Sequence, residues 1–479
     1  MFRSLSERNY RIWFGGALVS NIGAWMQATT QSWVVLTELT DNNAAAVGTT
    51  MALQFGPQLL LVPFSGAVAD RFDRRRVLLV TQSLLMLLAA GLGALLITGS
   101  AELWHLYAFA LGLGIVNSFD TTSRQAFVSD LVGTDNLANA VALNSASFNS
   151  ARLVGPAVAG VLIAAVGSGW VFVINAASFL AVLGALLLID TVHERPLPGA
   201  RRESQAQQLM AGFRYVRRRH DLVVIFIIVF IVGAFSMNFP VISSTMAVEF
   251  GRGASDYGLL SSVLAIGSLA GALLAARRTD ARMRVVILSV GALGAVSLLA
   301  AFMPTFWTFA ATLIFFGFAV STMLTTANGF VQTTADPVVR GRVLALYFAV
   351  LQGGTPIGAP LVGAAADALG ARSTLVISGA AGLITFCIGV GWLITERQLR
   401  FHRRGGLRLG VTHAGRPGID DDPSLQSETL TAPISVLRRA PASSGLGDSA
   451  PQEGAITATG TIDLNDVDTG PVGTGGTRD

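Results

Sequence analysis

Residues 66–79 of this 479-residue chain read GAVADRFDRRRVLL, an apolar run that ends at Asp70, a burst of arginines, and the start of a second apolar run. This order is typical of a short turn between two membrane-spanning helices. Arginine is too costly to move through a bilayer, so Arg71, Arg74 and their neighbours assign this turn to the cytoplasmic side. Asp70 and Arg74 would share one side of a helical turn. Gly66 would let two helices approach closely.

The composition of the whole chain supports a membrane protein. Hydrophobic residues make up 52% of the sequence and charged residues only 13%, whereas a soluble protein carries about a quarter charged residues. All 33 basic residues are arginine, which we attribute to the codon usage of a GC-rich genome. These arginines lie in short polar turns rather than in one stripe, so the high pI does not indicate a nucleic-acid partner.

Apolar runs long enough to cross a bilayer account for most of the chain. A membrane helix needs about 20 mostly apolar residues. Roughly twelve such runs occur, at residues 12–37, 45–69, 77–98, 103–121, 137–166, 170–189, 222–248, 257–276, 285–303, 306–326, 343–366 and 374–394. The sequence therefore predicts an all-α membrane protein of twelve transmembrane helices.

The distribution of arginine tests this count. Arginines concentrate in the turns after even-numbered runs and after the last run, within residues 71–76, 124, 195–219, 277–284, 340–342 and 397–404. The other turns hold only Arg252 and Arg372, together with acids such as Glu38 and Glu102. This alternation follows the positive-inside rule. We therefore predict a multi-pass protein of the inner (cytoplasmic) cell membrane, with both termini cytoplasmic.

The first and second parts of the chain look like repeats of each other. Gly155 and Pro156 lie inside the fifth run, and a Pro-Ile-Gly sequence begins at Pro356 inside the eleventh, 200 residues after Pro156. The turn 66–80 has a degraded counterpart at 271–286, which ends in spaced arginines and, in this alignment, has lost the acid. Two six-helix, pseudo-symmetric halves are the predicted architecture.

The predicted organisation has four parts: an N-terminal bundle, a linker, a C-terminal bundle and a tail, at residues 1–190, 191–221, 222–395 and 396–479. In the linker, Leu209, Phe213 and Val216 follow helical spacing among arginines, which predicts a basic amphipathic helix on the inner membrane face. The tail is rich in Gly, Pro, Ser, Thr and Asp. It has too few apolar residues to fold, so we expect it to be disordered and cytoplasmic.

The sequence carries no motif of enzyme chemistry. It contains no nucleophile elbow, no phosphate-binding loop and no metal-ligand spacing, and its five histidines are scattered. Cys387 is the only cysteine and lies in an apolar run, so it forms no intrachain disulfide and cannot build a zinc site alone. We therefore expect a protein that is not an enzyme and that holds no metal and no cofactor.

One ionisable side chain stands out inside a predicted span. A polar stripe with the spacing i, i+4, i+7, i+11 follows one face of the fifth run: Ser145, Asn149, Arg152 and Pro156. Such a stripe should face a water-filled cavity or a partner helix, because lipid cannot solvate it. Arg152 either has a direct functional role in such a cavity or pairs with carbonyl groups or a carboxylate to hold two helices together.

The stretch 66–79 resembles the GxLaDrxGrr loop between the second and third helices of major facilitator superfamily transporters. One departure is Asp73, where the family pattern has glycine. The resemblance implies that Asp70 and Arg74, with an acid at the cytoplasmic end of the fourth helix, form a charge relay that latches the outward-open state. Asp120 stands at the place of that acid.

The segment ARLVGPAVAG, residues 151–160, resembles the Gly-Pro antiporter motif of exporters in the same superfamily, although the upstream glycines of that motif are missing. Proline removes a backbone hydrogen bond and glycine removes side-chain bulk, so the helix could bend and pack closely here. The residues predicted to control the conformational change are Gly66, Asp70, Arg71, Arg74, Asp120, Gly155, Pro156 and Gly160.

The family fold would place a central cavity between the first, fourth, seventh and tenth helices, beside the fifth and eleventh. The candidate cavity residues are amides, one arginine and two aromatic rings: Asn21, Gln27, Gln31, Gln54, Asn149, Arg152, Phe235, Asn238, Phe239, Asn328 and Gln352. Such a lining suits a bulky, amphipathic, weakly charged molecule. Each amide could equally form hydrogen bonds between helices.

Residues 117–145 and the run RGRVLALYF at 340–348 resemble the branch that includes enterobactin-type siderophore exporters and macrolide efflux proteins. The resemblance implies a monomeric, proton-coupled exporter of a small molecule, a siderophore or drug, that works by alternating access among membrane lipids. No clear mid-membrane carboxylate is present to carry the proton, so facilitated efflux is an alternative. A lipid or lysophospholipid translocator and a non-transporting membrane sensor are two further alternatives.

Overall fold

The computed structural model describes residues 3–189, 205–278, 281–396, 400–404 and 408–412, and these residues are almost entirely helical. The helices are η1 (Arg3–Ser6), α1 (Arg8–Thr37), α2 (Ala44–Arg71), α3 (Arg74–Ile97), α4 (Leu103–Leu131), α5 (Thr134–Val166), α6 (Ser168–Leu188), α7 (Gln205–Arg217), α8 (His220–Phe235), α9 (Phe239–Glu249), α10 (Ala254–Ala276), α11 (Met283–Ala301), α12 (Phe306–Thr334), α13 (Arg340–Leu369) and α14 (Arg372–Glu396). Two strands, β1 (Arg400–Arg404) and β2 (Arg408–Thr412), pair antiparallel after α14.

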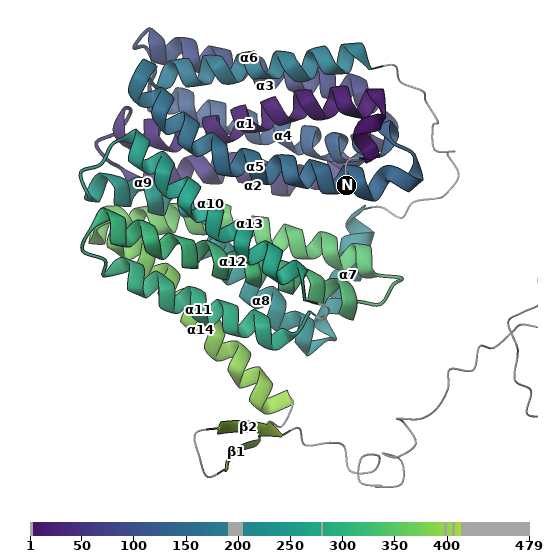
Figure 1. Cartoon of the computed structure of the whole chain (residues 1–479), viewed down its shortest axis with the longest axis vertical. Helices are drawn as coiled ribbons and strands as arrows, with labels where there is room; N and C mark the ends of the chain where they lie inside the picture. The colour runs from purple at the N-terminus through teal and green to yellow at the C-terminus, as the bar shows by residue number, and fades with distance from the viewer. Residues whose placement is uncertain (1–2, 190–204, 279–280, 397–399, 405–407, 413–479) are drawn as a thin grey trace, which may run out of the picture. The chain divides into compact units, whose positions relative to one another are not determined.

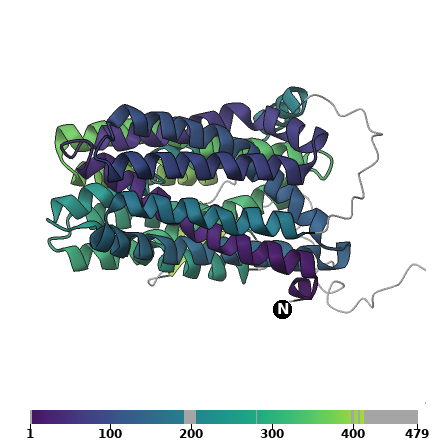
Figure 2. The ribbon, with the colours of Figure 1, turned by 90° about the horizontal axis from the view of Figure 1, so that it is seen from above.

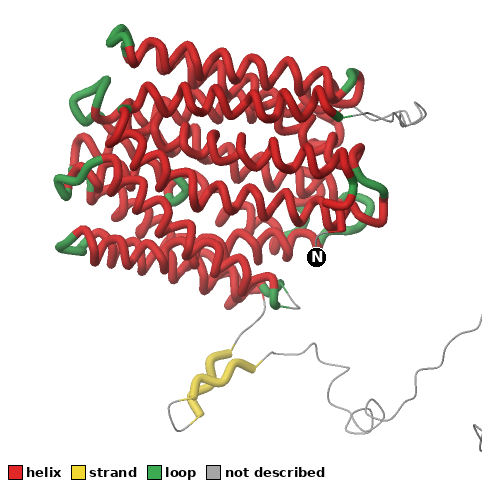
Figure 3. The backbone as a smooth tube through the Cα atoms, turned by 45° about the horizontal axis from the view of Figure 1, so that its top comes forward, coloured by secondary structure: helices red, strands yellow, loops and turns green. Residues whose placement is uncertain are grey.

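Local sequence signals set the ends of these helices. The Asn43 side chain accepts a hydrogen bond from the Ala46 amide at 2.9 Å and caps the start of α2. α5 and α13 each stop at a glycine with positive φ, Gly167 at 90° and Gly370 at 87°, a conformation that other residues rarely adopt. Figure 3 shows most of the loops at the two ends of the bundle.

The two ends of the bundle differ in charge. The arginine-rich end carries the turn 71–76 and the start of α13, and it lies on the right in Figure 1, together with the N-terminus. The arginine-poor end carries the turns 38–43, 98–102 and 250–253. By the positive-inside rule we expect the arginine-rich end to be the cytoplasmic one.

Each predicted apolar run coincides with a helix, except that the seventh run forms two helices, α8 and α9. Pro240 stands in the first turn of α9 and has no N–H with which to continue the hydrogen bonds of α8, so the helix breaks before it. In the described residues, nine helices are long and apolar enough to cross a membrane, or ten if the bent pair Ala44–Leu61 and Phe64–Arg71 counts as one span. The count of twelve is consistent with this number and stays a prediction.

Helices α1–α6 form one half of the bundle and α8–α14 the other, and the two colour ranges separate clearly in Figure 1. Seen from above in Figure 2, the long helices run in nearly the same direction. The halves meet mainly along two pairs of helices, α2 with α13 and α5 with α10. Each pair contributes one helix from each half, so this seam is where any relative movement of the halves must act.

Glycines bring the paired helices into backbone contact. A Cβ atom added to Gly48 of α2 would lie 2.2 Å from the Ala359 carbonyl oxygen of α13. A Cβ added to Gly258 of α10 would lie 2.3 Å from the Pro156 carbonyl oxygen of α5. Any larger side chain at either glycine would therefore force the halves apart.

The same two pairs are joined a second time, nearer the ends of α5 and α13. A Cβ on Gly160 of α5 would lie 2.7 Å from the Ala254 carbonyl oxygen of α10. A Cβ on Gly363 of α13 would lie 2.4 Å from the Ala44 carbonyl oxygen of α2. All four glycine contacts lie toward the arginine-poor end, because α2 and α10 begin there and α5 and α13 end there.

These contacts fix the register of the internal repeat. Gly48 and Gly258 are 210 positions apart and have equivalent partners, and so do Gly160 and Gly363, which are 203 positions apart. Gly155 therefore corresponds to Gly358. The sequence prediction that matched the prolines at a separation of 200 was wrong by three residues. Apolar helices align poorly by sequence, whereas close backbone contacts tolerate only one register.

The same register changes the counterpart of the charged turn. An offset of 210 places residue 280 opposite Asp70, and residue 280 is also an aspartate. The sequence comparison paired residue 66 with residue 271, an offset of 205, and so predicted that the second turn had lost its acid. With the offset of 210, the acid is present. Asp280 itself lies outside the described residues.

The predicted linker and tail are described in part. A helix was predicted within 191–221, and α7 occupies this segment, where the Tyr215 hydroxyl accepts a hydrogen bond from the Asp336 amide at 3.2 Å. Phe213 is 53% exposed on this helix. Residues 400–404 and 408–412 form the hairpin β1–β2, inside the segment that we expected to be disordered from residue 396 onward. The rest of the predicted tail, 413–479, lies outside the described residues.

Candidate transport pathway

The charged turn between α2 and α3 is anchored by Arg74. Its Nη1 contacts the Asp130 Oδ1 at 2.5 Å near the end of α4 and donates to the Ala126 carbonyl oxygen at 3.4 Å. Asp73 caps the start of α3, since its side chain accepts from the Arg76 amide at 3.2 Å. The extra acid in this turn is thus explained as a helix cap, and Arg74 ties α3 to α4.

Asp120 forms a separate buried network inside the same half. Its carboxylate accepts hydrogen bonds from the Thr81 hydroxyl at 2.8 Å and from the Gln82 amide at 2.6 Å, and it pairs with Arg124 at 3.1 Å. The Arg124 guanidinium also lies 5.6 Å from the centre of the Trp13 ring. The network therefore joins α1, α3 and α4, with its charges balanced inside the N-terminal half.

The predicted relay of Asp70, Arg74 and Asp120 is thus divided between two contacts. Arg74 contacts Asp130, ten positions beyond Asp120, and Asp120 contacts Arg124 one turn along its own helix. Asp70 and Arg71 are exposed at the end of α2, and Gly66 is partly buried one turn earlier. The role of these residues in gating stays a prediction.

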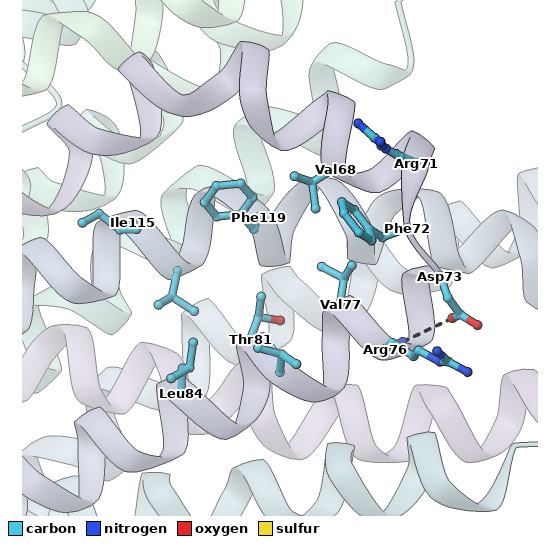
Figure 4. Close-up of a pocket in the computed structure, with 12 residues that line it drawn as sticks. Val68, Arg71, Phe72, Asp73, Arg76, Val77, Thr81, Leu84, Ile115 and Phe119 are labelled. Carbon is cyan, nitrogen blue, oxygen red and sulfur yellow. Dashed lines mark hydrogen bonds between the residues drawn. The ribbon is translucent and has the colours of Figure 1, made fainter.

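A groove of about 960 Å³ lies beside this turn, between α2, α3 and α4. Its walls are mostly apolar, with Val68, Leu84 and Ile115 among them, and Arg71 and Arg76 stand where it reaches the arginine-rich end (Figure 4). An apolar wall beside two cations has the chemistry that suits an amphipathic molecule with an anionic head.

A second pocket, of about 550 Å³, lies at the arginine-poor end between the two halves. Here Asp367 of α13 accepts hydrogen bonds from the Ala44 and Ala45 amides at 2.7 and 2.9 Å, which are the first two amides of α2. A carboxylate at a helix N-terminus is favourable because it satisfies free amides and complements the helix dipole. Asp367 therefore bonds the C-terminal half to the N-terminal half.

Aromatic packing adds to the closure of the arginine-poor end. Trp33 of α1 stacks on Tyr257 of α10 with ring centres 5.7 Å apart, and Tyr257 is fully buried. The glycine seam, Asp367 and this stack all join the halves in the same region.

Several predicted cavity amides connect helices within the N-terminal half. Asn21 donates to the Ser147 hydroxyl at 3.2 Å, and Gln31 donates to Gln54 at 3.1 Å. Gln27 is buried and accepts from Asn175 of α6. For these residues the structure shows the interhelical role that the sequence left open.

The break between α8 and α9 lies beside three other predicted residues. Asn238 is fully buried in the break, donates to the Ala234 carbonyl oxygen, and leaves its Oδ1 without a hydrogen-bond partner among the described residues. Phe235 ends α8, and Phe239 begins α9 and lies 6.3 Å from the ring of Phe316. Broken helices with free polar atoms are typical of substrate sites in transporters.

Arg152 lies near the middle of α5 beside aromatic rings. Its guanidinium carbon is 5.8 Å from the centre of the Trp25 ring, which also meets Phe148 edge-on at 5.5 Å. A cation–π contact contributes about 1–2 kcal/mol, whereas an arginine at the centre of a bilayer costs about 3 kcal/mol. The ring alone does not offset the burial of this charge.

The remaining candidates are amides on three helices, of which Asn149 and Gln352 are exposed and Asn328 is half-buried. Asn149 donates to the Ser145 carbonyl oxygen at 2.8 Å, and both residues are exposed on α5. Asn328 accepts from Gln332 at 2.5 Å on α12, and Gln352 is exposed on α13. Gly155 is packed against Trp25, where an added Cβ would lie 2.6 Å from the Trp25 Cβ.

The sequence reasoning missed Asp130, Asp367 and the stack of Trp33 on Tyr257. Asp130 and Asp367 stand at helix ends, so they read as ordinary surface acids, and only the fold brings them to Arg74 and to α2. No group of three or more His, Cys, Asp or Glu side chains in the described part of the chain could hold a metal ion.

Several known proteins similar to this chain are transporters. A staphyloferrin A transporter from Staphylococcus aureus is 26% identical over 395 residues, which cover 81% of this chain and 97% of that protein. An enterobactin exporter, EntS, from Shigella boydii is 26% identical over 366 residues, covering 75% of this chain and 85% of that protein. These matches confirm the predicted branch and show that the chain is a transporter rather than an enzyme.

The fold agrees with that of solved transporters. The crystal structure of the nucleoside transporter NupG matches with a TM-score of 0.62 at 13% identity, covering 80% of this chain and 98% of that one. An inward-facing bacterial homologue of the human lysosomal transporter Spinster also matches with a TM-score of 0.62, at 15% identity, covering 80% and 96% of the two chains. The transmembrane secretion effector family matches residues 1–398, and the chain therefore belongs to this family of major facilitator transporters.

Proposed function

We propose that this protein exports an amphipathic small molecule, a siderophore or drug, by alternating access driven by protons. One observation carries this proposal: the halves are joined at the arginine-poor end by a pseudo-symmetric glycine seam. Polar side chains on α5, α12 and α13 stay exposed toward the other end. A substrate could enter from that side and leave when the seam opens, as rocking of two halves requires. The similarity to a staphyloferrin A transporter and an enterobactin exporter supports a siderophore.

Uptake into inside-out membrane vesicles tests this function. Vesicles energised to be acidic inside should accumulate a member of a panel of siderophores, macrolides and dyes, and a protonophore should abolish the accumulation. Asp70→Asn should lower the uptake rate at least about tenfold if the turn controls the conformational change, while Asp41→Asn at the opposite end should change it little. Equal uptake with and without the protein would refute export, and insensitivity to the protonophore would leave facilitated efflux.

The orientation is part of the same proposal. In a Cys387→Ser background, Arg71→Cys and Arg217→Cys should react with a membrane-impermeant maleimide only in inside-out vesicles, because both lie at the arginine-rich end. Asp41→Cys should react only in right-side-out vesicles. Labelling of Arg71→Cys and Arg217→Cys from opposite sides would overturn the proposed two-half topology.

Translocation of a lysophospholipid is a second candidate, favoured by the groove between α2, α3 and α4. Its apolar walls and its two arginines would suit an acyl chain and a phosphate. Proteoliposomes with a fluorescent lysophospholipid in one leaflet test this function, since transport would change the fraction that external dithionite bleaches. Transport of the lipid but of no member of the small-molecule panel would select this alternative.

A further inference from the structure

Arg152 is the starting point, because its charge lies deep in the bundle. It stands 18 residues after the start of α5 and 14 before its end. At 1.5 Å per residue these separations are about 27 and 21 Å. The hydrocarbon core of a bilayer reaches only about 15 Å from its centre. Arg152 therefore lies near the middle of the membrane, too deep for lipid phosphates to reach it.

The structure gives this charge no acidic partner. Among the described residues, the contact of the Arg152 guanidinium is the Trp25 ring, and no carboxylate lies within ion-pair distance of it. Arg124 shows the contrast, since its charge is balanced by Asp120 at 3.1 Å. A buried cation without a counter-ion is unfavourable in a membrane unless an anion arrives to pair with it.

The fold itself does not require a cation at this position. The register of the repeat places Thr355 of α13 opposite Arg152, and the Thr355 hydroxyl donates to the Gly233 carbonyl oxygen at 3.4 Å. Asn149 corresponds to Gln352 in the same register, and both amides are exposed. The two halves thus share an exposed amide, but the arginine belongs to the N-terminal half alone.

The surface of α5 shows where Arg152 faces. Ser145 and Asn149, which share its side of the helix, are exposed, and so are Val154 and Val161 on the opposite side. The apolar side suits contact with lipid tails. The polar side, which carries Arg152, suits a water-filled space between the halves.

We propose that Arg152 binds an anionic group of the transported substrate, while Trp25 and Phe148 contact an adjacent apolar or aromatic part. Phe148 is 50% exposed, so a ring face remains available beside the guanidinium. A guanidinium binds carboxylate, sulfonate or phenolate oxygens through charged hydrogen bonds. The substrate class is therefore an aromatic or amphipathic organic anion. That the bound anion is also transported rests on the proposed export function, whereas its binding can be measured independently of transport.

Binding of two dyes that differ by one charge tests the proposal. The purified full-length protein in lipid nanodiscs is titrated by calorimetry with 8-anilinonaphthalene-1-sulfonate and with uncharged N-phenyl-1-naphthylamine, and empty nanodiscs are subtracted. We expect the wild type to bind the sulfonate on the order of tenfold more tightly than the uncharged dye. Equal affinities would overturn the proposal, and this comparison needs no variant to fold.

Variants separate binding from a structural role. Arg152→Gln should lose the preference for the sulfonate and keep its affinity for the uncharged dye, Arg152→Lys should keep part of the preference, and Arg278→Gln at an exposed turn should resemble the wild type. If Arg152→Gln lost affinity for both dyes, the residue would serve only to hold α5 against α1. If the charge preference follows Arg152 but vesicles accumulate neither dye, the binding site stands and the export function fails.

Discussion

At the scale of single residues, two acids in the same half illustrate how burial decides the importance of a charge. Asp120 is buried and accepts three hydrogen bonds, whereas the side chain of Asp130 is 40% exposed beside Arg74. Removing one partner of a buried pair leaves a buried charge uncompensated, while a surface pair contributes little. The sequence pointed to Asp120 through a family resemblance, and the structure shows that its partner is Arg124.

We predict that Asp120→Asn lowers the free energy of unfolding by about 3 kcal/mol, because Arg124 would lose its counter-charge inside the helix packing. The matched variant Asp130→Asn should cost no more than about 1 kcal/mol. Thermal unfolding of both variants in the same detergent measures the difference. If Asp130→Asn destabilises the protein as much as Asp120→Asn, burial does not explain the role of these acids.

At the scale of helices, glycine spacing decides which elements can touch. α2 carries Gly48, which is pressed against α13, and Gly56, beside which an added Cβ would meet nothing within 4 Å. Both glycines look alike in the sequence. Their different surroundings follow from the seam, since Gly48 lies against the backbone of α13 and Gly56 does not.

Gly48→Ala should shift the protein toward conformations that are open at the arginine-poor end, since its Cβ would lie 2.2 Å from the Ala359 carbonyl oxygen. The reporter is Ala366→Cys in a Cys387→Ser background, because Ala366 is buried in the seam. Its reaction with a maleimide should be several-fold faster in Gly48→Ala and unchanged in Gly56→Ala. Similar rates in all three backgrounds would contradict a close-packed gate.

At the scale of the whole molecule, the two halves are related but not identical. Asp367 caps α2 from the other half, while the equivalent position on α5, Ala164, has no carboxylate to offer α10. On the α2–α13 side the arginine-poor end is therefore closed by a charged bond, whereas on the α5–α10 side it is closed by glycine packing and by a neutral hydrogen bond from the Ser255 hydroxyl to the Gly160 carbonyl oxygen at 3.3 Å. Opening of this end requires the loss of the bonds from Asp367 to the Ala44 and Ala45 amides.

Asp367→Ala should populate an open arginine-poor end, because two charge-assisted hydrogen bonds between the halves are lost. Spin labels at Ser100→Cys and Phe302→Cys, one on each half in a Cys387→Ser background, report the separation by pulsed electron resonance. The fraction of molecules with a longer distance between the labels should rise in Asp367→Ala. It should stay at the wild-type level in Asp41→Ala, whose acid lines the same pocket. An unchanged distribution would show that the glycine seam closes this end without the cap.

The amino-acid sequence alone determined the helices and the placement of arginine at one end, because apolar length and the cost of moving charge through lipid are local properties. It also indicated the family, through the stretch that begins at Gly66. Only the tertiary structure decided the break before Pro240, the register that matches Gly155 with Gly358, and the partners of Arg74 and Asp120. These depend on which distant backbones meet, and apolar sequence is nearly uniform in the membrane, so the contacts are chosen by close packing rather than by hydrophobic pattern.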